Sequence, residues 1–173
     1  MITGERVRMR ALEPSDAETL WRWHNDPEVM RWMSDGYPPS LAHLTKELSE
    51  RAADTFGDLT LIIETLEGRT IGIVALREAE PEVGDARLDI YLGEKDTWGK
   101  GYATEAMRLI CRYGFGQMRL HRITLTAVAQ NTAARRVYEK VGFVEEGRMR
   151  EAFRRDGVWH DKVVMGLLEG ELR

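Results

Sequence analysis

The first apolar positions of the chain alternate with charged ones. Between residues 6 and 10, valine and methionine lie between three arginines, and a period of two is typical of a half-buried strand rather than of a helix face. This pattern ends near Pro14. Ser15 followed by Glu18 has the spacing of a capping box, which predicts the start of a helix carrying Leu20 and two tryptophans. The chain is therefore expected to open with a strand and then a helix.

The rest of the chain continues with strand and helix patterns. Ser40 is the expected N-cap of a second helix, because leucines follow it at helical spacing. Strand-like runs flank the turns Glu67-Gly68 and Asp156-Gly157, which predicts two hairpins. The remaining predicted elements are strands at 59–65, 70–76 and 87–92, a helix at 103–118, a strand at 123–128, a helix at 131–140, and strands at 143–153 and 158–167. The order β-α-α-β-β-β-α-β-α-β-β, without repeat or linker, predicts one mixed α/β domain over residues 1–173.

Composition narrows the classes of function. With 43% apolar and 31% charged residues, the chain resembles a globular protein and not a disordered one. Because 25 Lys and Arg stand against 29 Asp and Glu, we expect no nucleic-acid partner, and an anionic ligand needs a local site. One cysteine excludes an internal disulfide, and four irregularly spaced histidines predict no metal site. Neither an export signal nor a membrane-spanning run is found, so we expect a cytoplasmic protein without a membrane partner.

The strongest chemical feature is a glycine-rich loop between a strand and a helix. It reads Trp98-Gly99-Lys100-Gly101-Tyr102-Ala103-Thr104. Glycines let backbone N–H groups approach phosphate oxygens, and the positive end of the following helix favours an anion. The spacing does not fit a P-loop, and a dinucleotide fingerprint would need glycine at Thr104. The loop therefore indicates an anion site of another kind, with a purely structural turn as the alternative.

A second feature lies on a later helix. Asn131, Ala134 and Tyr138 are three and then four residues apart, so they share one helical face. The same helix runs into Gly142-Phe143, where the glycine is expected to end it. One amide and one phenol are therefore expected to face the same neighbour.

Together these segments resemble the GCN5-related N-acetyltransferases (GNAT). The resemblance rests on residues 98–106, on residues 131–138 and on Lys140-Val141-Gly142-Phe143, which occur in the order of that family. The chain is further similar to the branch of the ribosomal-protein N-terminal acetyltransferases. That similarity includes Asn25-Asp26-Pro27-Glu28-Val29 and Gly157-Val158-Trp159-His160-Asp161, and it covers nearly the whole chain.

The resemblance implies a strongly curved mixed sheet of about six or seven strands with a V-shaped splay, flanked by about four helices. In such a fold the strand at 87–92 parts from the strand at 123–128, and acetyl-CoA binds in the resulting slot. Many relatives have Gln or Arg where this chain has Trp98, but the backbone supplies most donors, so binding is expected to survive with Lys100 and Arg135 as helpers. The cofactor-binding residues that the resemblance implies are Ile90, Leu92, Trp98, Gly99, Lys100, Gly101, Tyr102, Ala103, Thr104, Asn131, Ala134 and Arg135.

Acyl transfer to an amine requires two proton transfers. An ordinary ammonium stays protonated near pH 7 and must lose a proton before it can attack, so a carboxylate has to accept that proton directly or through water. The resemblance implies that Tyr138 protonates the leaving thiolate as a general acid. Related polyamine acetyltransferases carry acidic residues near the position of Asp35, which makes Asp35 the first candidate for the base. Asp89, Glu151 and Asp161 are the alternatives.

The resemblance thus implies acetyl transfer from acetyl-CoA to a primary amine by direct attack in a ternary complex. We expect a protein N-terminal amine as acceptor, with a polyamine or an aminated antibiotic as alternatives. A non-catalytic acyl-CoA-binding module is the competing class, and a homodimer is expected from the resemblance alone. Trp21, Trp23 and Trp32 are expected in the core, with the wall of an acceptor pocket as the alternative.

Overall fold

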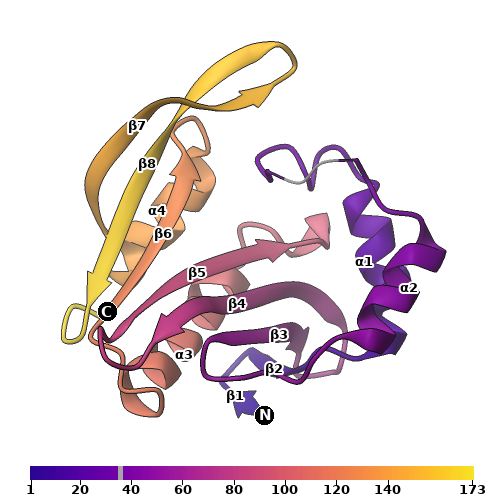
Figure 1. The fold of residues 1–173 in the computed structure, drawn as a ribbon, viewed down its shortest axis with the longest axis horizontal. Helices are drawn as coiled ribbons and strands as arrows, with labels where there is room; N and C mark the ends of the chain where they lie inside the picture. Colours follow the sequence, from indigo (N-terminus) through magenta and orange to yellow (C-terminus); the bar gives the residue numbers. More distant parts are fainter. Residues whose placement is uncertain (35–36) are drawn as a thin grey trace.

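The computed structural model describes residues 1–34 and 37–173, and its strands form a single mixed sheet (Figure 1). The strand order is β1-β2-β3-β4-β5-β6-β8-β7, and only the β5–β6 pair is parallel. The strands are β1 Ile2–Thr3, β2 Val7–Ala11, β3 Asp58–Thr65, β4 Thr70–Glu80, β5 Asp85–Leu92, β6 Arg122–Val128, β7 Val144–Arg155 and β8 Val158–Leu168. The helices are α1 Ala17–His24, α2 Leu41–Glu50, α3 Tyr102–Gly116 and α4 Thr132–Val141, with 3-10 turns at Pro14–Asp16 and Lys95–Thr97.

The predicted α/β class and the predicted hairpins are confirmed, with two corrections. The sheet has eight strands rather than six or seven, because Ile2 and Thr3 pair with β2. The capping box lies two residues before the predicted one: the Asp16 carboxylate accepts a hydrogen bond from the N–H of Glu13 at 2.9 Å. A 3-10 turn therefore precedes α1.

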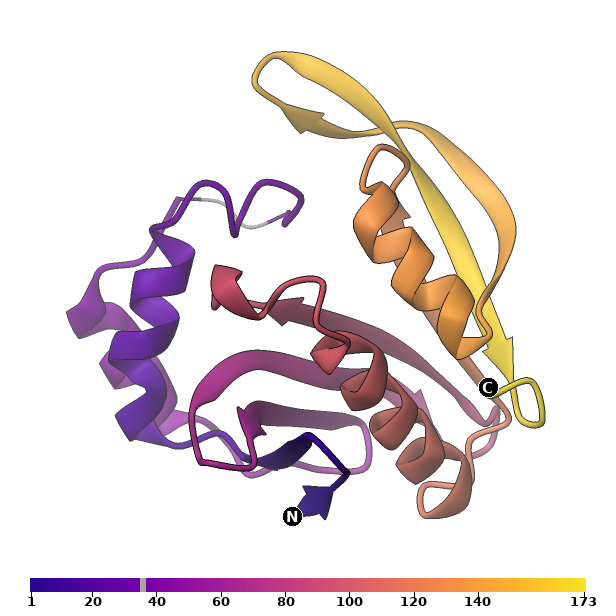
Figure 2. The same cartoon turned by 180° about the vertical axis from the view of Figure 1, so that it is seen from behind.

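The helices cover the two faces of the sheet (Figure 2). On one face α3 packs against the strands, and its Met107 and Ile110 are fully buried with Val74 and Leu76 of β4. On the other face α1 and α2 enclose a smaller core that includes Trp23 and Ile62. None of the described helices is long and apolar enough to cross a membrane.

The strands β5 and β6 are paired only where they begin. The parallel register joins residues 85–87 of β5 to residues 122–124 of β6. Beyond that point β5 stays paired with β4 as far as Leu92, and β6 stays paired with β8 as far as Val128. The two halves of the sheet therefore diverge after Arg87, which confirms the V-shaped splay (Figure 1).

A cluster of ion pairs joins α1 to the sheet. Arg10 of β2 donates to Asp16 at 2.7 and 2.8 Å and to Glu64 of β3 at 2.6 Å, and Arg8 also binds Glu64 at 2.7 Å. The side chains of both acids are only 6% exposed. Burial by itself raises the pKa of Asp16 and Glu64, but hydrogen bonds, chiefly from the arginines, outweigh it and hold both pKa values below their ordinary range. The position of α1 therefore depends on a charged cluster in the protein interior.

The strands β7 and β8 form a hairpin that projects from the body of the protein (Figure 1). Its turn residues Asp156 and Gly157 have φ of 51° and 77°, a left-handed backbone that favours glycine. Next to the turn, Arg155 donates to the carbonyl oxygen of Met33 at 2.5 Å, and the rings of Trp32 and His160 meet edge to face with centroids 5.5 Å apart. Residues 30–33, which follow α1, are thus tethered to the hairpin.

Candidate active site

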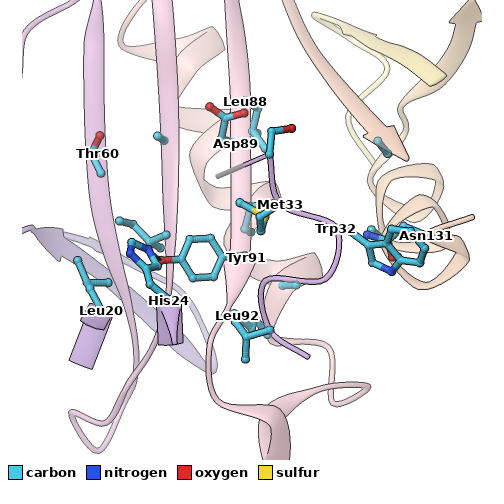
Figure 3. Close-up of a pocket in the computed structure, with 18 of the residues that line it drawn as sticks. Leu20, His24, Trp32, Met33, Thr60, Leu88, Asp89, Tyr91, Leu92 and Asn131 are labelled. Carbon is cyan, nitrogen blue, oxygen red and sulfur yellow. Dashed lines mark hydrogen bonds between the residues drawn. The ribbon is translucent and has the colours of Figure 1, made fainter. Parts of the chain in front are cut away.

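A cleft of about 1440 Å³ opens where β5 and β6 diverge (Figure 3). Figure 3 shows side chains from several elements facing it, among them Asp89 of β5, Asn131 beside α4 and His24 of α1. We call the two ends of this cleft the loop end and the α2 end. The loop end comprises Trp98, Gly99, Ala103, Asn131 and Ala134, and the α2 end comprises Leu44, Leu48, Thr60, Ile73 and Ala75.

The predicted phosphate loop forms the rim of the loop end. Gly99 and Gly101 have φ of 73° and 86°, which favours glycine, and Gly101 is the N-cap of α3. The first N–H groups of a helix have no carbonyl partner within the helix, so those of residues 102–104 are available to an anion. Apart from Gly99 itself and its two chain neighbours, no described residue has an atom within 4 Å of the place that a Cβ on Gly99 would take. A phosphate group can therefore approach the backbone closely.

Trp98 fixes this loop to the end of β5. Its Nε1–H donates to the carbonyl oxygen of Leu92 at 3.0 Å, and the residue is 40% exposed at the cleft. The residue that differs from the usual Gln or Arg therefore joins loop and strand through its side chain. The backbone N–H groups remain as the donors for an anion.

The N-terminal segment holds the loop from behind. The Glu105 carboxylate, in the first turn of α3, accepts hydrogen bonds from the N–H groups of Glu5 at 2.6 Å and Arg6 at 2.9 Å. The Arg6 guanidinium donates to the carbonyl oxygen of Lys100 at 2.9 Å. The roles of Glu105 and Arg6 were not predictable from the sequence, because no local spacing connects segments so far apart in the chain. Both residues serve to position the loop.

Asn131 and Tyr138 both line the cleft, as their shared helical face predicts. Asn131 is the N-cap of α4, and its Oδ1 accepts a hydrogen bond from the N–H of Ala134 at 3.3 Å, which orients the amide. Burial raises the pKa of Tyr138 to about 12, and the negative charge of Asp89 adds to the effect. The hydroxyl makes no hydrogen bond to any residue that the structure describes. Tyr138 is therefore protonated at neutral pH and free to donate.

Ile90 and Leu92 lie on the part of β5 that has left β6. Both line the cleft, and on the other edge of β5 they are register partners of Val74 and Gly72 in β4. The backbone groups that face the splay have no strand partner in residues 1–34 and 37–173, and the carbonyl oxygen of Leu92 among them already accepts the indole N–H of Trp98. An extended ligand can pair with this edge as an added strand would.

The predicted bases lie in different places. Asp89 lines the cleft, with its Oδ2 at 3.1 Å from Arg77 Nε. Glu151 and Asp161 lie at a separate small cavity on the β7–β8 hairpin, where the Glu151 N–H donates to Asp161 at 2.9 Å and lowers the pKa of that carboxyl. Neither of these two lines the main cleft. Asp35, the first candidate, lies outside the described residues.

The two predicted helpers face other partners. The Arg135 guanidinium donates to Glu145 at 2.9 Å and to the carbonyl oxygen of Ala129 at 3.3 Å. Lys100 is exposed, and its carbonyl oxygen accepts a hydrogen bond from Arg6. Their contribution to phosphate binding stays a prediction.

Sequence reasoning missed several cleft residues. His24 Nε2 lies 3.1 Å from the hydroxyl oxygen of Tyr91, and both side chains line the cleft (Figure 3). Trp23 is buried in the core as expected, whereas Trp32 lines the cleft and Trp21 is 36% exposed. Residue type alone gave no signal for these differences, because they arise from tertiary packing: Trp21 and Trp23 are on α1, whereas Trp32 lies beyond α1 against Phe153 and His160 of the hairpin.

Comparison with known proteins identifies the family. The family model described as "Acetyltransferase (GNAT) domain" matches residues 6–144, most of the chain. The chain belongs to the GNAT acetyltransferases. It is 30% identical over 173 residues to the "Putative ribosomal N-acetyltransferase YdaF" of Bacillus subtilis, covering 97% of this chain and 94% of that protein. It is 28% identical to the spermidine N(1)-acetyltransferase of Vibrio cholerae, covering 97% and 96%.

Solved GNAT structures agree with this assignment. The spermidine N-acetyltransferase from Vibrio cholerae, in complex with CoA and spermine, has a TM-score of 0.87 at 27% identity and covers 95% of this chain and 96% of that one. A GNAT-family acetyltransferase from Bacillus anthracis has a TM-score of 0.84 at 25% identity, covering 98% and 99%.

Membership in the GNAT family defines the reaction class. The protein is an N-acetyltransferase that uses acetyl-CoA as co-substrate. The relatives are named for two kinds of acceptor, ribosomal and spermidine, so the family does not distinguish between them. Within the described ranges, no group of three or more His, Cys, Asp or Glu side chains could hold a metal ion.

Proposed function

We propose that this GNAT transfers the acetyl group of acetyl-CoA to the N-terminal amine of a polypeptide, by direct attack in a ternary complex. The observation that carries the proposal is the meeting of the glycine loop, the open edge of β5 and the Tyr138 hydroxyl at one cleft. The loop end offers backbone donors to a pyrophosphate, and the α2 end leaves room for a second substrate.

The residues of the loop end fit acetyl-CoA. The backbone N–H groups of Gly99, Gly101 and the first turn of α3 would hold the pyrophosphate, because they form an uncovered helix N-terminus. The edge of β5 at Ile90 and Leu92 would pair with the amides of pantetheine, with Asn131 and Ala134 on the opposite wall. When bound, acetyl-CoA supplies an activated acyl group on a thiol leaving group.

Tyr138 would hold the proton that the departing sulfur takes. Its raised pKa, about 12, keeps the hydroxyl protonated at neutral pH. The acceptor ammonium must lose a proton to a base, for which Asp35 is our first candidate and Asp89 our second. Arg77 and Arg87 lie 3.1 and 3.6 Å from Asp89 Oδ2 and fix that carboxylate beside the path of the acceptor.

The charges of the cleft favour a polypeptide amine over a polyamine. A polyamine carries additional ammonium groups, and each needs a carboxylate that is not already paired. Asp89 is paired with Arg77, and Glu28 lies 2.9 Å from Lys95. Among the described lining residues, four carboxylates stand against five basic side chains: Glu28, Glu47, Glu50 and Asp89 against Arg31, Arg51, Arg77, Arg87 and Lys162.

Acceptor identity is tested by incubating purified protein and acetyl-CoA with lysine-free peptides, the same peptides with blocked N-termini, spermidine and an aminoglycoside. CoA release and product mass are measured for each. We expect transfer to free peptide N-termini and none to the blocked peptides. A higher kcat/KM for spermidine than for every peptide would favour the polyamine alternative.

The base is tested by comparing Asp35→Asn and Asp89→Asn with the parent protein. The variant that removes the base should have a lower kcat than the parent, and its kcat should no longer increase with pH as that of the parent does. The KM for acetyl-CoA should stay the same. Should both variants keep the parent pH–rate profile, neither carboxylate is the base. A homodimer stays a prediction, and the mass from light scattering tests it.

A further inference from the structure

Three of the five residues that define the α2 end of the cleft have large aliphatic side chains, namely Leu44, Leu48 and Ile73. We infer that this end is a pocket for a large apolar side chain on the carbon that bears the acceptor amine. The inference rests on the proposed polypeptide acceptor and adds which N-termini are accepted. Those beginning with Leu, Met or Phe would be preferred to those beginning with Ala or Ser.

The floor of this pocket is a row of side chains across three strands. Thr60 of β3 is the register partner of Ala75 of β4, and Ala75 is the register partner of Asp89 of β5. Neighbouring strands lie about 4.8 Å apart, so Ala75 lies one strand away from Asp89. Figure 3 shows Thr60 and Asp89 facing the same space from their two strands. Ala75 has the smallest side chain of the row, and because it is only 2% exposed it lies at the bottom of a narrow depression.

Larger side chains surround this low point. The adjacent row on the same face of the sheet is Ile62, Ile73 and Tyr91, which packs beneath α1 and α2. From above, Leu44 and Leu48 of α2 line the cleft. The depression over Ala75 therefore has isoleucine and leucine walls.

The charges around the pocket are held at its rim. Asp89 is bound by Arg77, as described above. On α2, Glu47 and Glu50 lie 3.9 Å from His43 and Lys46 respectively, and both are more than 60% exposed. A cationic side chain placed over Ala75 would lose its hydration, which is costly, and the carboxylate beside Ala75 in register, Asp89, is already bound by Arg77. An apolar side chain would instead bury its surface against the leucine walls.

The pocket lies within reach of the reacting amine. Tyr138 and Asp89 both line the cleft and interact electrostatically, and in the proposed reaction the amine must arrive beside them. The first side chain of a peptide branches from the carbon that bears this amine, so it can extend over the neighbouring strand to Ala75. A methyl or hydroxymethyl side chain would leave the depression unfilled.

The test uses peptides of one sequence that differ only in the first residue, with Ala, Ser, Leu, Phe or Lys in that place. We expect kcat/KM for the Leu and Phe peptides to exceed that for the Ala peptide about 10- to 100-fold, the range that a few methylene groups provide. Leu48→Ser should reduce this preference several-fold. Leu41→Ser is the matched control, because Leu41 is on the same helix, 37% exposed and outside the cleft lining.

A second variant fills the pocket instead of opening it. Ala75→Val keeps a side chain suited to a strand and should shift the preference from Leu and Phe toward Ala. Circular dichroism and the KM for acetyl-CoA show whether each variant is folded. If Leu48→Ser does not fold, the preference measured for Ala75→Val tests the inference instead. Equal kcat/KM for the Ala, Ser and Leu peptides would overturn the inference and leave the proposed function intact. No transfer to any peptide, together with transfer to spermidine, would overturn the proposed function itself.

Discussion

The loop end and the α2 end of the cleft are built from different parts of the chain. At the loop end the functional groups belong to two continuous segments, residues 98–104 and 131–138, and many of them are backbone N–H groups. At the α2 end they are side chains of α2, β3 and β4, brought together by strand register and helix packing. The donor site can therefore be identified from local sequence, whereas the acceptor site depends on the tertiary structure.

The two ends are also held in place separately. Glu105 and Arg6 attach the loop to the turn after β1. The cluster of Arg10, Asp16 and Glu64 attaches α1 to the sheet, and Arg155 attaches the segment after α1 to the β7–β8 hairpin. Variants at these anchors should therefore change the kinetics of one substrate more than those of the other.

The largest expected effect comes from Arg10→Ala. Without the guanidinium, the nearly buried carboxylates Asp16 and Glu64 lose a positive charge that helps to offset the cost of burying them. The free energy of unfolding should therefore fall by about 3–5 kcal/mol. Because α1 lines the cleft, we expect the acceptor KM to rise more than the acetyl-CoA KM. Urea unfolding and steady-state kinetics measure both, with Arg112→Ala on the exposed surface of α3 as the control.

The effect of Arg10→Ala should depend on pH. The pKa values of Asp16 and Glu64 are lowered in the folded state, so the cluster stabilises the protein fully above their ordinary values, near 4. That stabilisation is lost as the pH falls through the lower folded pKa values. The difference in unfolding free energy between parent and variant should therefore narrow below about pH 4. A constant difference down to pH 2 would contradict this assignment.

Tyr138→Phe removes a single oxygen at the centre of the cleft. If Tyr138 is the general acid, kcat should fall about 100-fold while the KM for acetyl-CoA changes little. Since burial raises the pKa of Tyr138 to about 12, its ionisation should not reduce the parent rate below about pH 10. Tyr113→Phe on α3, outside the cleft lining, is the matched control. An unchanged kcat in Tyr138→Phe would remove the proposed role and leave the fold assignment untouched.

The parts of the fold and of the cleft that the sequence could predict are those formed by residues close together in the chain. Long periodic patterns predicted the helices and all strands but β1, whose two residues are too few to show a period. The loop at 98–104 and the face shared by Asn131 and Tyr138 were predictable because their residues are close in sequence. Thr60 and Ala75 were not, because only the register of β3, β4 and β5 places them beside Asp89.

Gly101→Ala tests whether the loop end depends on backbone conformation. Gly101 has φ of 86°, and a left-handed conformation costs a residue with a Cβ about 1–2 kcal/mol. The KM for acetyl-CoA should rise about tenfold with little change in the acceptor KM. Gly116→Ala is the control, because this glycine is helical, has no positive φ and has open space around it. A rise in both KM values would mean that the loop also shapes the acceptor site.

Arg155→Met, at the end of β7, should have the mildest consequence of these variants. The guanidinium donates to the carbonyl oxygens of Met33 and Met30, and losing about 1 kcal/mol of hydrogen bonding should raise the acceptor KM about fivefold. Arg154→Met is the control, because Arg154 is exposed and stacks on Trp159 of the hairpin. If the acetyl-CoA KM rises by the same factor, the hairpin supports both ends of the cleft. If the acceptor KM alone rises, the segment after α1 belongs to the acceptor site, and the two ends are separable by single substitutions.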